Sequence, residues 1–309
     1  MRIAILGAGG VGGYYGGLLA RAGHPVSLLA RGAHLAALRQ RGLEVRTPEE
    51  TFTARVEAAA DAEELTGAEL AIVAVKGYSL SAIAPAARRL AEAGAVILPL
   101  LNGVEAADRL VDAGVPGDRV LGGLAEISAV RSAPGVVERR SPFYRVVLGE
   151  RAGGLSERAE RIAATFREAG VEARASADIT GDLWRKFIFI TTMSAACGLA
   201  RSPIGPVRKA PLGPLLIERA VHEVAAVARA RGVALAADAE SQILAFIASL
   251  PETMKPSFLL DLESGGPTEI DDLSGAVSRL GRLAGVPTPV HDVATASLGV
   301  GAAGRRAGS

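Results

Sequence analysis

The first residues of the chain, MRIAILGAGGVG, constrain its fold more than any other stretch. The run RIAIL predicts a strand, and the following VGGYYGGLLARAG predicts a helix that ends at Gly23. Between them Gly7, Gly9 and Gly12 keep the spacing G-x-G-x-x-G. In that setting the first glycine permits a tight turn, the second lets the backbone approach a diphosphate, and the third lets the helix pack on the strand. The alternative is a glycine-rich turn that serves packing alone.

We therefore predict a dinucleotide-binding β-α-β unit, whose helix start offers free amides to the phosphates. The candidate cofactor contacts in this turn are Gly7, Ala8, Gly9, Gly10, Val11 and Gly12.

The next apolar run, VSLL, is followed by Ala30 and Arg31 rather than by an acid. Enzymes that prefer NAD usually carry Asp or Glu at the end of the second strand, where the carboxylate bonds the ribose 2′-hydroxyl. A carboxylate would repel a 2′-phosphate, whereas a guanidinium binds it with two hydrogen bonds. We therefore expect NADP(H) as the cofactor, with Arg31 on its 2′-phosphate. The alternative is that Arg31 is an incidental solvated side chain.

The rest of the chain divides into two patterns. Residues 1–176 alternate short apolar runs with helical stretches, which is typical of an α/β domain with a Rossmann-type, doubly wound parallel sheet. The runs between 119 and 150 predict consecutive strands, as an antiparallel extension of that sheet. Residues 177–309 predict an all-helical domain that carries substrate and catalytic residues. The helices expected there are Asp178–Ala200, Pro211–Arg231, Asp238–Leu250, Thr268–Gly285 and Val290–Leu298.

Composition excludes several classes of function. The formal net charge is only +1 over 309 residues, so we expect neither a nucleic-acid nor a membrane partner. The apolar run from Phe187 to Ala200 is shorter than the roughly 20 residues of a membrane span. A single cysteine, Cys197, allows no internal disulfide and favours a cytoplasmic location. The four histidines lack metal-ligand spacing, so no metal is expected. Cys197 and Trp184 are expected to be packing residues.

Two stretches of the second half carry candidate chemistry. Lys186 lies in an otherwise apolar helix, so its ammonium must reach solvent or a cleft. Glu269 lies in the segment PTEIDD, which is alternatively a helix start with Thr268 as its cap and Asp271 completing a capping box. Ser257 is a candidate substrate contact, and the alternative for it is a helix cap.

Together these motifs resemble the ketopantoate reductases (2-dehydropantoate 2-reductases), within the group of 6-phosphogluconate-dehydrogenase-like proteins. The resemblance covers nearly the whole chain. It rests on GAGGVGG, LLARG, VAVKGY, LLNGV, LWRKF, RSPIG and PSFLLDLESGGPTEIDDLSG, in that order.

The resemblance implies NADPH-dependent reduction of a 2-oxo acid to a 2-hydroxy acid. The first candidate substrate is 2-dehydropantoate, in pantothenate biosynthesis, and a related 2-oxo acid is the alternative. Lys186 matches the catalytic lysine, and Glu269 matches an acid that orients the site. Asn102 matches an asparagine that lines the nicotinamide and substrate region, so it is expected to contact both cofactor and substrate. Glu269 is expected to be a second catalytic residue and to contact the cofactor. Ser257 matches a contact of the substrate carboxylate, and Lys76 matches a lysine close to cofactor and substrate.

The chain departs from the family four and eight residues after Lys186. There Ile190 and Ser194 replace asparagines on the same helical face, and Met254 replaces a third. We expect Ile190 and Ser194 to line the substrate site and to weaken the binding of a substrate hydroxyl. Lys255 is a further candidate contact for an anionic group.

Two other functions stay open at this point. A 3-hydroxy acid dehydrogenase would use a lysine in the same place, commonly with an asparagine four residues later, where this chain has Ile190. A non-catalytic NADP(H)-binding regulator could share the fold. The helical half is also a candidate for a homodimer interface.

Overall fold

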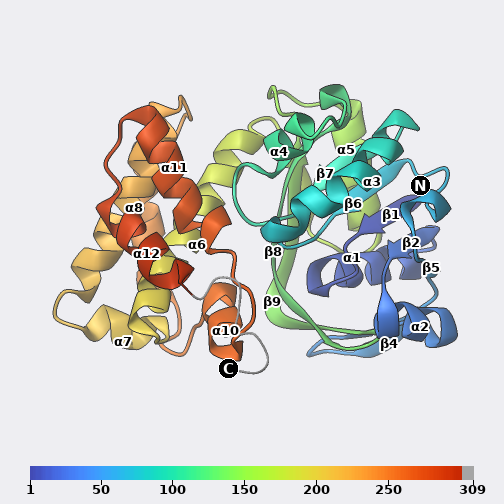
Figure 1. The fold of residues 1–309 in the computed structure, drawn as a ribbon, viewed down its shortest axis with the longest axis horizontal. Coiled ribbons are helices and arrows are strands. Elements are labelled where there is room, and N and C mark those ends of the chain that lie inside the picture. The colour runs from blue at the N-terminus through green and yellow to red at the C-terminus, as the bar shows by residue number, and fades with distance from the viewer. Residues whose placement is uncertain (301–309) are drawn as a thin grey trace. The chain divides into compact units, whose positions relative to one another are not determined.

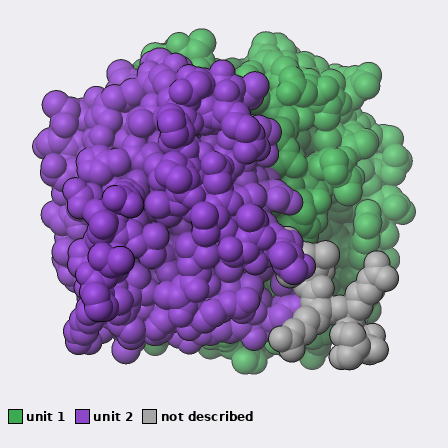
Figure 2. All heavy atoms as spheres, turned by 60° about the vertical axis from the view of Figure 1, so that its left-hand side comes forward, with its two compact units in different colours: residues 1–101, 105–180 green, residues 102–104, 181–309 purple. Residues whose placement is uncertain are grey.

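The computed structural model describes residues 1–300 and divides into two compact units. Unit 1 comprises Met1–Leu101 and Glu105–Thr180. Unit 2 comprises Asn102–Val104 and the chain from Gly181 onward. Figure 2 shows the two units in different colours. The short segment Asn102–Val104 thus leaves the unit that its neighbours in sequence belong to.

Unit 1 contains the predicted parallel sheet (Figure 1). The strand order is β5-β2-β1-β6-β7, and every neighbouring pair is parallel. The three central strands are almost wholly buried, because helices cover both faces. This confirms the prediction of an α/β fold. The strands are β1 (Ile3–Leu6), β2 (Val26–Leu29), β5 (Glu57–Ala59), β6 (Leu70–Val73) and β7 (Val96–Pro99).

The later strands of unit 1 form a second sheet rather than an extension of the first. Its order is β10-β9-β3-β4, and β8 pairs with β9 as a long antiparallel hairpin. The runs GVVERR and YRVVLGE, expected as two strands, join in one strand that bulges opposite Ser128. The strands are β3 (Leu43–Arg46), β4 (Thr51–Ala54), β8 (Gly122–Ala133), β9 (Val136–Gly149) and β10 (Ala173–Ser176).

The first helix, α1 (Gly10–Arg21), packs between these two sheets, which explains its glycines. A Cβ at Gly16 would contact Ile5 and Leu28 of the parallel sheet at 3.2 Å. A Cβ at Gly13 would lie 2.6 Å from Val137, and one at Gly17 would lie 2.5 Å from Val45, both in the second sheet. Glycines on two faces therefore let one helix approach two sheets closely. The remaining helices of unit 1 are α2 (Gly32–Arg41), α3 (Leu80–Glu92), α4 (Ala106–Asp112) and α5 (Glu157–Glu168), with 3-10 turns η1 (Ala62–Glu64), η2 (Gly77–Ser79) and η3 (Gly117–Arg119).

Unit 2 is helical, as predicted, but its helices differ in detail from the expectation. The expected helix Thr268–Gly285 is broken into a 3-10 turn and a helix that starts at Ser274. Two short helices were not anticipated, because one contains Gly and Pro and neither is long enough to show a clear periodicity. The elements are α6 (Ile179–Ala200), α7 (Ile204–Lys209), α8 (Gly213–Ala230), α9 (Ala239–Ser249), α10 (Ser257–Ser264), η4 (Ile270–Asp272), α11 (Ser274–Ala284) and α12 (Pro289–Gly299).

The core of unit 2 is built around α6. Trp184 packs edge-to-face on Phe187 with ring centroids 5.5 Å apart, and Cys197 is fully buried. Burial raises the pKa of the Cys197 thiol to about 12, so the thiol stays protonated. Both residues are therefore packing residues, as expected. A Cβ at Gly198 would lie 3.0 Å from Phe258, so this glycine lets α10 pack closely on α6.

Buried polar groups join α8, α11 and α12. The Glu223 carboxylate accepts hydrogen bonds from the backbone N–H groups of Val290 and His291, which open α12. The His291 ring lies between the Ser274 hydroxyl and the Ala220 carbonyl, each 3.1 Å away. A carbonyl only accepts, so Nε2 of the neutral ring carries the proton. Burial lowers the pKa of His291 to about 4.

Candidate functional site

The glycine turn after β1 has the geometry of a phosphate-binding turn. Gly7 has φ +115°, and a Cβ there would lie 2.7 Å from the Ala74 carbonyl oxygen. A Cβ at Gly12 would lie 2.2 Å from the Gly7 oxygen. The conformational reasons for these two glycines are thereby confirmed. At Gly9, by contrast, an added Cβ would have no atom of residues 1–300 within 4 Å. The open space beside Gly9 suits the diphosphate of a dinucleotide.

The helix that follows is left open for an anion. Gly9 is the N-cap of α1, no side chain caps the helix, and its first turn contains no acid. Its first N–H groups and the positive end of its dipole therefore suit a phosphate. Within the turn, Ala8 is buried and Val11 partly buried. A Cβ at Gly10 would lie 2.1 Å from the Ala129 carbonyl oxygen, so Gly10 is also required for packing against β8.

Arg31 and Lys76 lie at the same edge of the sheet as the glycine turn. Leu6 pairs with Leu29 on one side and with Val73 on the other, so the chain leaves all three strands at one level. Arg31 is exposed and precedes α2, whose first turn contains no acid. Lys76 is partly buried and precedes η2. Ligands of open α/β sheets bind at this carboxyl edge.

Unit 2 contains a hydrogen-bonded chain of three predicted site residues. The Lys186 ammonium donates to Asn102 Oδ1 at 3.1 Å, and Asn102 Nδ2 donates to Glu269 Oε2 at 3.4 Å. Lys186 and Asn102 are partly exposed, whereas Glu269 is buried. These partners lie 84 and 167 residues apart in sequence. The two neighbours fix the amide, with its oxygen toward the cation and its nitrogen toward the carboxylate.

Gly103 holds this arrangement in place, and sequence reasoning missed it. Its φ is +96°, and a Cβ there would lie 3.1 Å from the Asp272 carbonyl oxygen in η4. Glycine therefore lets the segment Asn102–Val104 pass close to the turn that carries Glu269. The signal was present in LLNGV, where a glycine directly follows the candidate asparagine.

The alternative that PTEIDD is the start of a long helix, capped by Thr268 with Asp271 completing a capping box, is wrong. The helix α11 begins at Ser274, and Glu269 precedes η4 instead. Thr268 Oγ1 is buried without a hydrogen-bond partner in the described part of the chain, so it caps nothing. The Glu269 carboxylate faces Asn102.

One turn along α6 from Lys186 the surface is apolar. Phe189 and Ile190 lie three and four residues after the lysine, and both are partly exposed. Ser194 is only 2% exposed, and its hydroxyl donates to the Ile190 carbonyl at 2.7 Å. Its proton is therefore engaged within the helix.

The other predicted contacts lie on or beside α10. Ser257 is exposed at the first position of this helix, and because Pro256 is the N-cap, the helix-cap alternative for Ser257 is wrong. Lys255 lies 2.8 and 2.9 Å from the two carboxylate oxygens of Glu263, so its charge is engaged in an ion pair. Met254 is partly buried against the core of unit 2. Within residues 1–300, Ser257 is not part of the chain of hydrogen bonds from Lys186.

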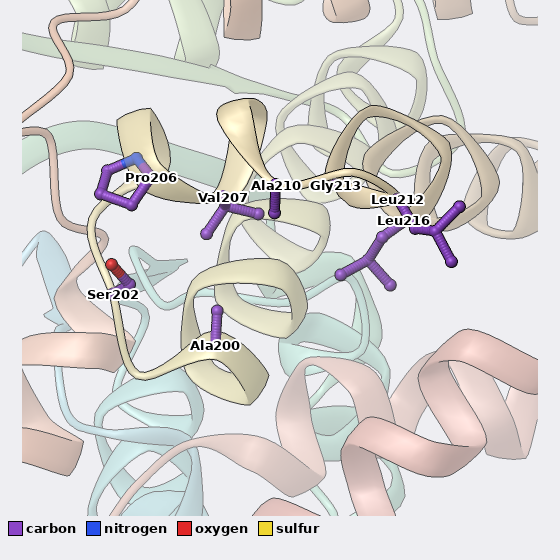
Figure 3. A pocket seen from close by; sticks show the side chains of 8 residues that line it. All are labelled: Ala200, Ser202, Pro206, Val207, Ala210, Leu212, Gly213 and Leu216. Carbon is purple, nitrogen blue, oxygen red and sulfur yellow. The ribbon is translucent and has the colours of Figure 1, made fainter.

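A separate hollow of about 550 Å³ lies where α6 ends and α7 and α8 begin (Figure 3). Along α6, Ala200 is roughly 20 Å from Lys186. The lining side chains are apolar apart from one hydroxyl, so they offer no acid or base for catalysis. It is lined by Ala200, Ser202, Pro206, Val207, Ala210, Leu212, Gly213 and Leu216.

None of the helices within residues 1–300 combines the length and the apolar character needed to cross a membrane. In the same range, no three His, Cys, Asp or Glu side chains gather in a way that could hold a metal ion.

Comparison with known families identifies the chain. The ketopantoate reductase (PanE/ApbA) model matches residues 3–153, and the model of the ketopantoate reductase C-terminal domain matches residues 178–300. The chain belongs to the ketopantoate reductase family. The resemblance inferred from the motifs is confirmed.

Individual relatives agree with this assignment. The chain is 33% identical to a 2-dehydropantoate 2-reductase of Halobacterium salinarum over 295 residues, which covers 94% of this chain and 95% of the relative. It is 30% identical to the uncharacterized oxidoreductase YkpB of Bacillus subtilis over 299 residues, with 96% and 98% covered. Members of the family are oxidoreductases, so the chain is assigned as one.

Solved structures extend the comparison. A PanE/ApbA family ketopantoate reductase from Ralstonia eutropha superposes with a TM-score of 0.89 at 31% identity, over 98% of both chains. A D-mandelate dehydrogenase, solved with NADH and anilino(oxo)acetate, superposes with a TM-score of 0.88 at 26% identity, again over 98% of both chains. Together with the glycine turn, these neighbours assign a nicotinamide dinucleotide as the class of cofactor.

Proposed function

We propose that the protein reduces a 2-oxo acid to the corresponding 2-hydroxy acid with NADPH, and that 2-dehydropantoate is its first candidate substrate. The observation that carries the proposal is the partly exposed Lys186 ammonium, held by Asn102, which is in turn held by Glu269. Relatives named 2-dehydropantoate 2-reductase support the substrate. Family membership favours this activity over a 3-hydroxy acid dehydrogenase and over a non-catalytic regulator.

Reduction of the 2-oxo group requires the protein to place a proton donor beside the carbonyl oxygen. A bound reduced nicotinamide supplies the hydride that forms the new C–H bond at the 2-oxo carbon. As the C=O π bond breaks, its electron pair moves to oxygen, and the growing charge needs a nearby donor. The Lys186 ammonium donates a hydrogen bond to this oxygen and then a proton, which completes the hydroxyl group.

Asn102 and Glu269 orient the ammonium for this step. One Lys186 N–H is taken by Asn102 Oδ1, which fixes the direction of the ammonium, and an ammonium has three N–H groups to donate. If the Asn102 amide turned over, its NH₂ group would face the ammonium and the contact would be lost. Glu269 prevents this because its carboxylate accepts from Asn102 Nδ2. Asn102 and Glu269 therefore act as positioning residues for Lys186.

The choice of NADPH over NADH is supported by Arg31. The residue is exposed two positions after β2, and the first turn of α2 carries no acid that would repel a phosphate. A guanidinium there binds a 2′-phosphate and has no comparable partner on NADH. Replacing Arg31 with Ala should therefore raise the Kd of NADPH far more than that of NADH, as measured by cofactor fluorescence. An equal change for both would remove Arg31 from the 2′-phosphate.

A second candidate substrate is a 2-oxo acid with an apolar side chain. Phe189 and Ile190 present hydrocarbon beside Lys186, and the Ser194 proton is already engaged. A substrate hydroxyl placed there would lose hydrogen bonds that it makes in water. The similarity to a D-mandelate dehydrogenase solved with anilino(oxo)acetate supports a substrate of this kind.

A panel of 2-oxo acids tests the activity and separates the two substrates. 2-Dehydropantoate and 3,3-dimethyl-2-oxobutanoate differ by a single hydroxyl, and phenylglyoxylate adds an aromatic side chain. We expect at least one of them to accelerate NADPH oxidation, with one 2-hydroxy acid formed per NADPH consumed. If no 2-oxo acid accelerates the oxidation, the proposed function is wrong.

A further inference from the structure

The hairpin of β8 and β9 connects the start of α1 with the start of α2. At one end, the Ala129 carbonyl lies where a Cβ of Gly10 would be. At the other, the Gly135 N–H donates to His34 Nδ1 at 2.8 Å. Arg131 lies between these two contacts, and hence between the helix start that suits the diphosphate and the helix that follows Arg31.

Pairing within the hairpin shows which way Arg131 projects. Arg131 pairs with Val137, and directly opposite residues of antiparallel strands project to the same face. Val137 contacts α1 at Gly13, so this face is turned toward α1. Arg139 lies two residues further along β9 on the same face, and its guanidinium lies 5.9 Å from the ring of Tyr14 in α1. This contact supports the same orientation of the face. The Arg131 side chain therefore leaves the hairpin on the side of the dinucleotide-binding helix.

His34 links the hairpin to α2. Its ring is 4% exposed, and Nδ1 accepts from Gly135, so the neutral ring carries its proton on Nε2. Burial lowers the pKa of His34, and the positive charge of Arg131 lowers it further, whereas the Ala8 carbonyl raises it. The hairpin that carries Arg131 is therefore held against α2, the helix that follows Arg31.

Arg131 is a cation without a carboxylate partner. It is exposed, and it makes no ion pair with any acid of residues 1–300. Other arginines of the same hairpin are paired: Arg139 with Glu49, and Arg140 with Glu138. The first turns of α1 and α2 likewise contain no acid. The surface formed by Arg131 and the first turns of α1 and α2 is therefore suited to a strongly negative group.

We propose that Arg131 is a second cation for the 2′-phosphate of NADPH, acting together with Arg31. The inference rests on the proposed use of NADPH. A phosphate monoester carries nearly two negative charges at neutral pH and has three acceptor oxygens, which two guanidinium groups can share. The hairpin thus takes part in cofactor choice, although it belongs to the second sheet and not to the dinucleotide-binding sheet.

Equilibrium binding tests this assignment without relying on turnover. Arg131→Ala should raise the Kd of NADPH about tenfold and leave that of NADH within about twofold. The Kd of adenosine 2′,5′-bisphosphate, measured by calorimetry, should rise in the same proportion as that of NADPH. The Kd of 5′-AMP should not rise. Arg140→Ala is the matched control, because it removes an equal charge from the same hairpin and should leave all four constants unchanged. Arg131→Lys should recover part of the loss.

Three outcomes would overturn the assignment. An unchanged Kd for NADPH in Arg131→Ala would remove the residue from the cofactor site. Equal weakening of NADPH and NADH would show that the side chain does not act on the 2′-phosphate. A loss of NADPH affinity in Arg140→Ala as large as that in Arg131→Ala would show that the effect comes from the net charge of the hairpin. Failure of the unaltered protein to bind either cofactor would instead contradict the proposed function itself.

Discussion

The glycine turn of unit 1 and the Lys186 site of unit 2 are specified by the sequence in different ways. The turn is made by backbone within six consecutive residues, Gly7 to Gly12, between a strand and a helix that fix its ends. The Lys186 site is made by side chains from three segments, with partners 84 and 167 residues apart. A local backbone site follows from spacing alone, whereas a site of distant side chains requires the fold to bring them together.

The strongest test of the local site is Gly9→Val. The backbone of Gly9 is extended, and no atom of residues 1–300 lies within 4 Å of an added Cβ, so the variant should fold normally. The side chain would fill the space assigned to the diphosphate. The Kd of NADPH should rise on the order of 100-fold, because several hydrogen bonds to charged oxygens are lost together. Fluorescence titration measures the Kd, and urea unfolding checks stability; an unchanged Kd would show that the turn serves packing alone.

The second test concerns the stability of unit 2 at low pH. The pKa of His291 is lowered from 6.5 to about 4, so as the pH falls the unfolded chain takes up the proton first. The stability that the buried neutral ring contributes is present above pH 6.5 and is lost toward pH 4, by about 3 kcal/mol in total. Unit 1 contains His24 and His34, whose pKa values burial also lowers, so the contribution of His291 has to be isolated by substitution.

Urea unfolding between pH 7 and pH 4.5 measures this loss. His291→Gln should show a much smaller decrease in unfolding free energy than the unaltered protein over this range. Glu223, whose pKa is raised by burial, is present in both proteins, so its opposing contribution cancels in the difference. Equal decreases in the two proteins would exclude His291 as the source.

The third test concerns the part of the Lys186 site that local sequence does not describe. Gly103→Ala would strain a residue with φ +96° and would place its Cβ 3.1 Å from the Asp272 carbonyl oxygen. It should therefore displace Asn102 and lower kcat about tenfold, as Asn102→Ala should by removing one hydrogen bond to a charged group. Steady-state kinetics on both variants checks this. Gly103→Ala with unaltered kcat would show that the segment does not position Lys186.

The smallest expected effect is a change of specificity at Ile190. An amide at this position offers a substrate hydroxyl a hydrogen bond that isoleucine cannot. Ile190→Asn should raise the kcat/KM ratio of 2-dehydropantoate to 3,3-dimethyl-2-oxobutanoate about fivefold, which corresponds to one neutral hydrogen bond. The same ratio in Phe189→Leu, which stays apolar, is the control. A ratio that does not move in Ile190→Asn would place the substrate side chain elsewhere.

The same contrast explains which predictions succeeded. The parallel sheet, its glycine turn and the long helices follow from local periodicity. The second sheet does not follow from local periodicity, because β3 pairs with β9, which lies far along the chain. No local sequence pattern predicts such a pairing. Within unit 2, the acids of PTEIDD suggested a helix start, but the contact of Glu269 with Asn102 overrides that local preference. Gly103, His34 and Arg131 were missed because their roles depend on neighbours distant in sequence.

The central claim is that Lys186 supplies the proton while unit 1 holds the cofactor independently. Turnover and NADPH affinity of Lys186→Ala, measured on one preparation, test it most directly. We predict that kcat with the preferred 2-oxo acid falls about 10²- to 10⁴-fold, as expected for the loss of a positioned acid, while the Kd of NADPH stays within about twofold. Turnover at the level of the unaltered protein would contradict the account.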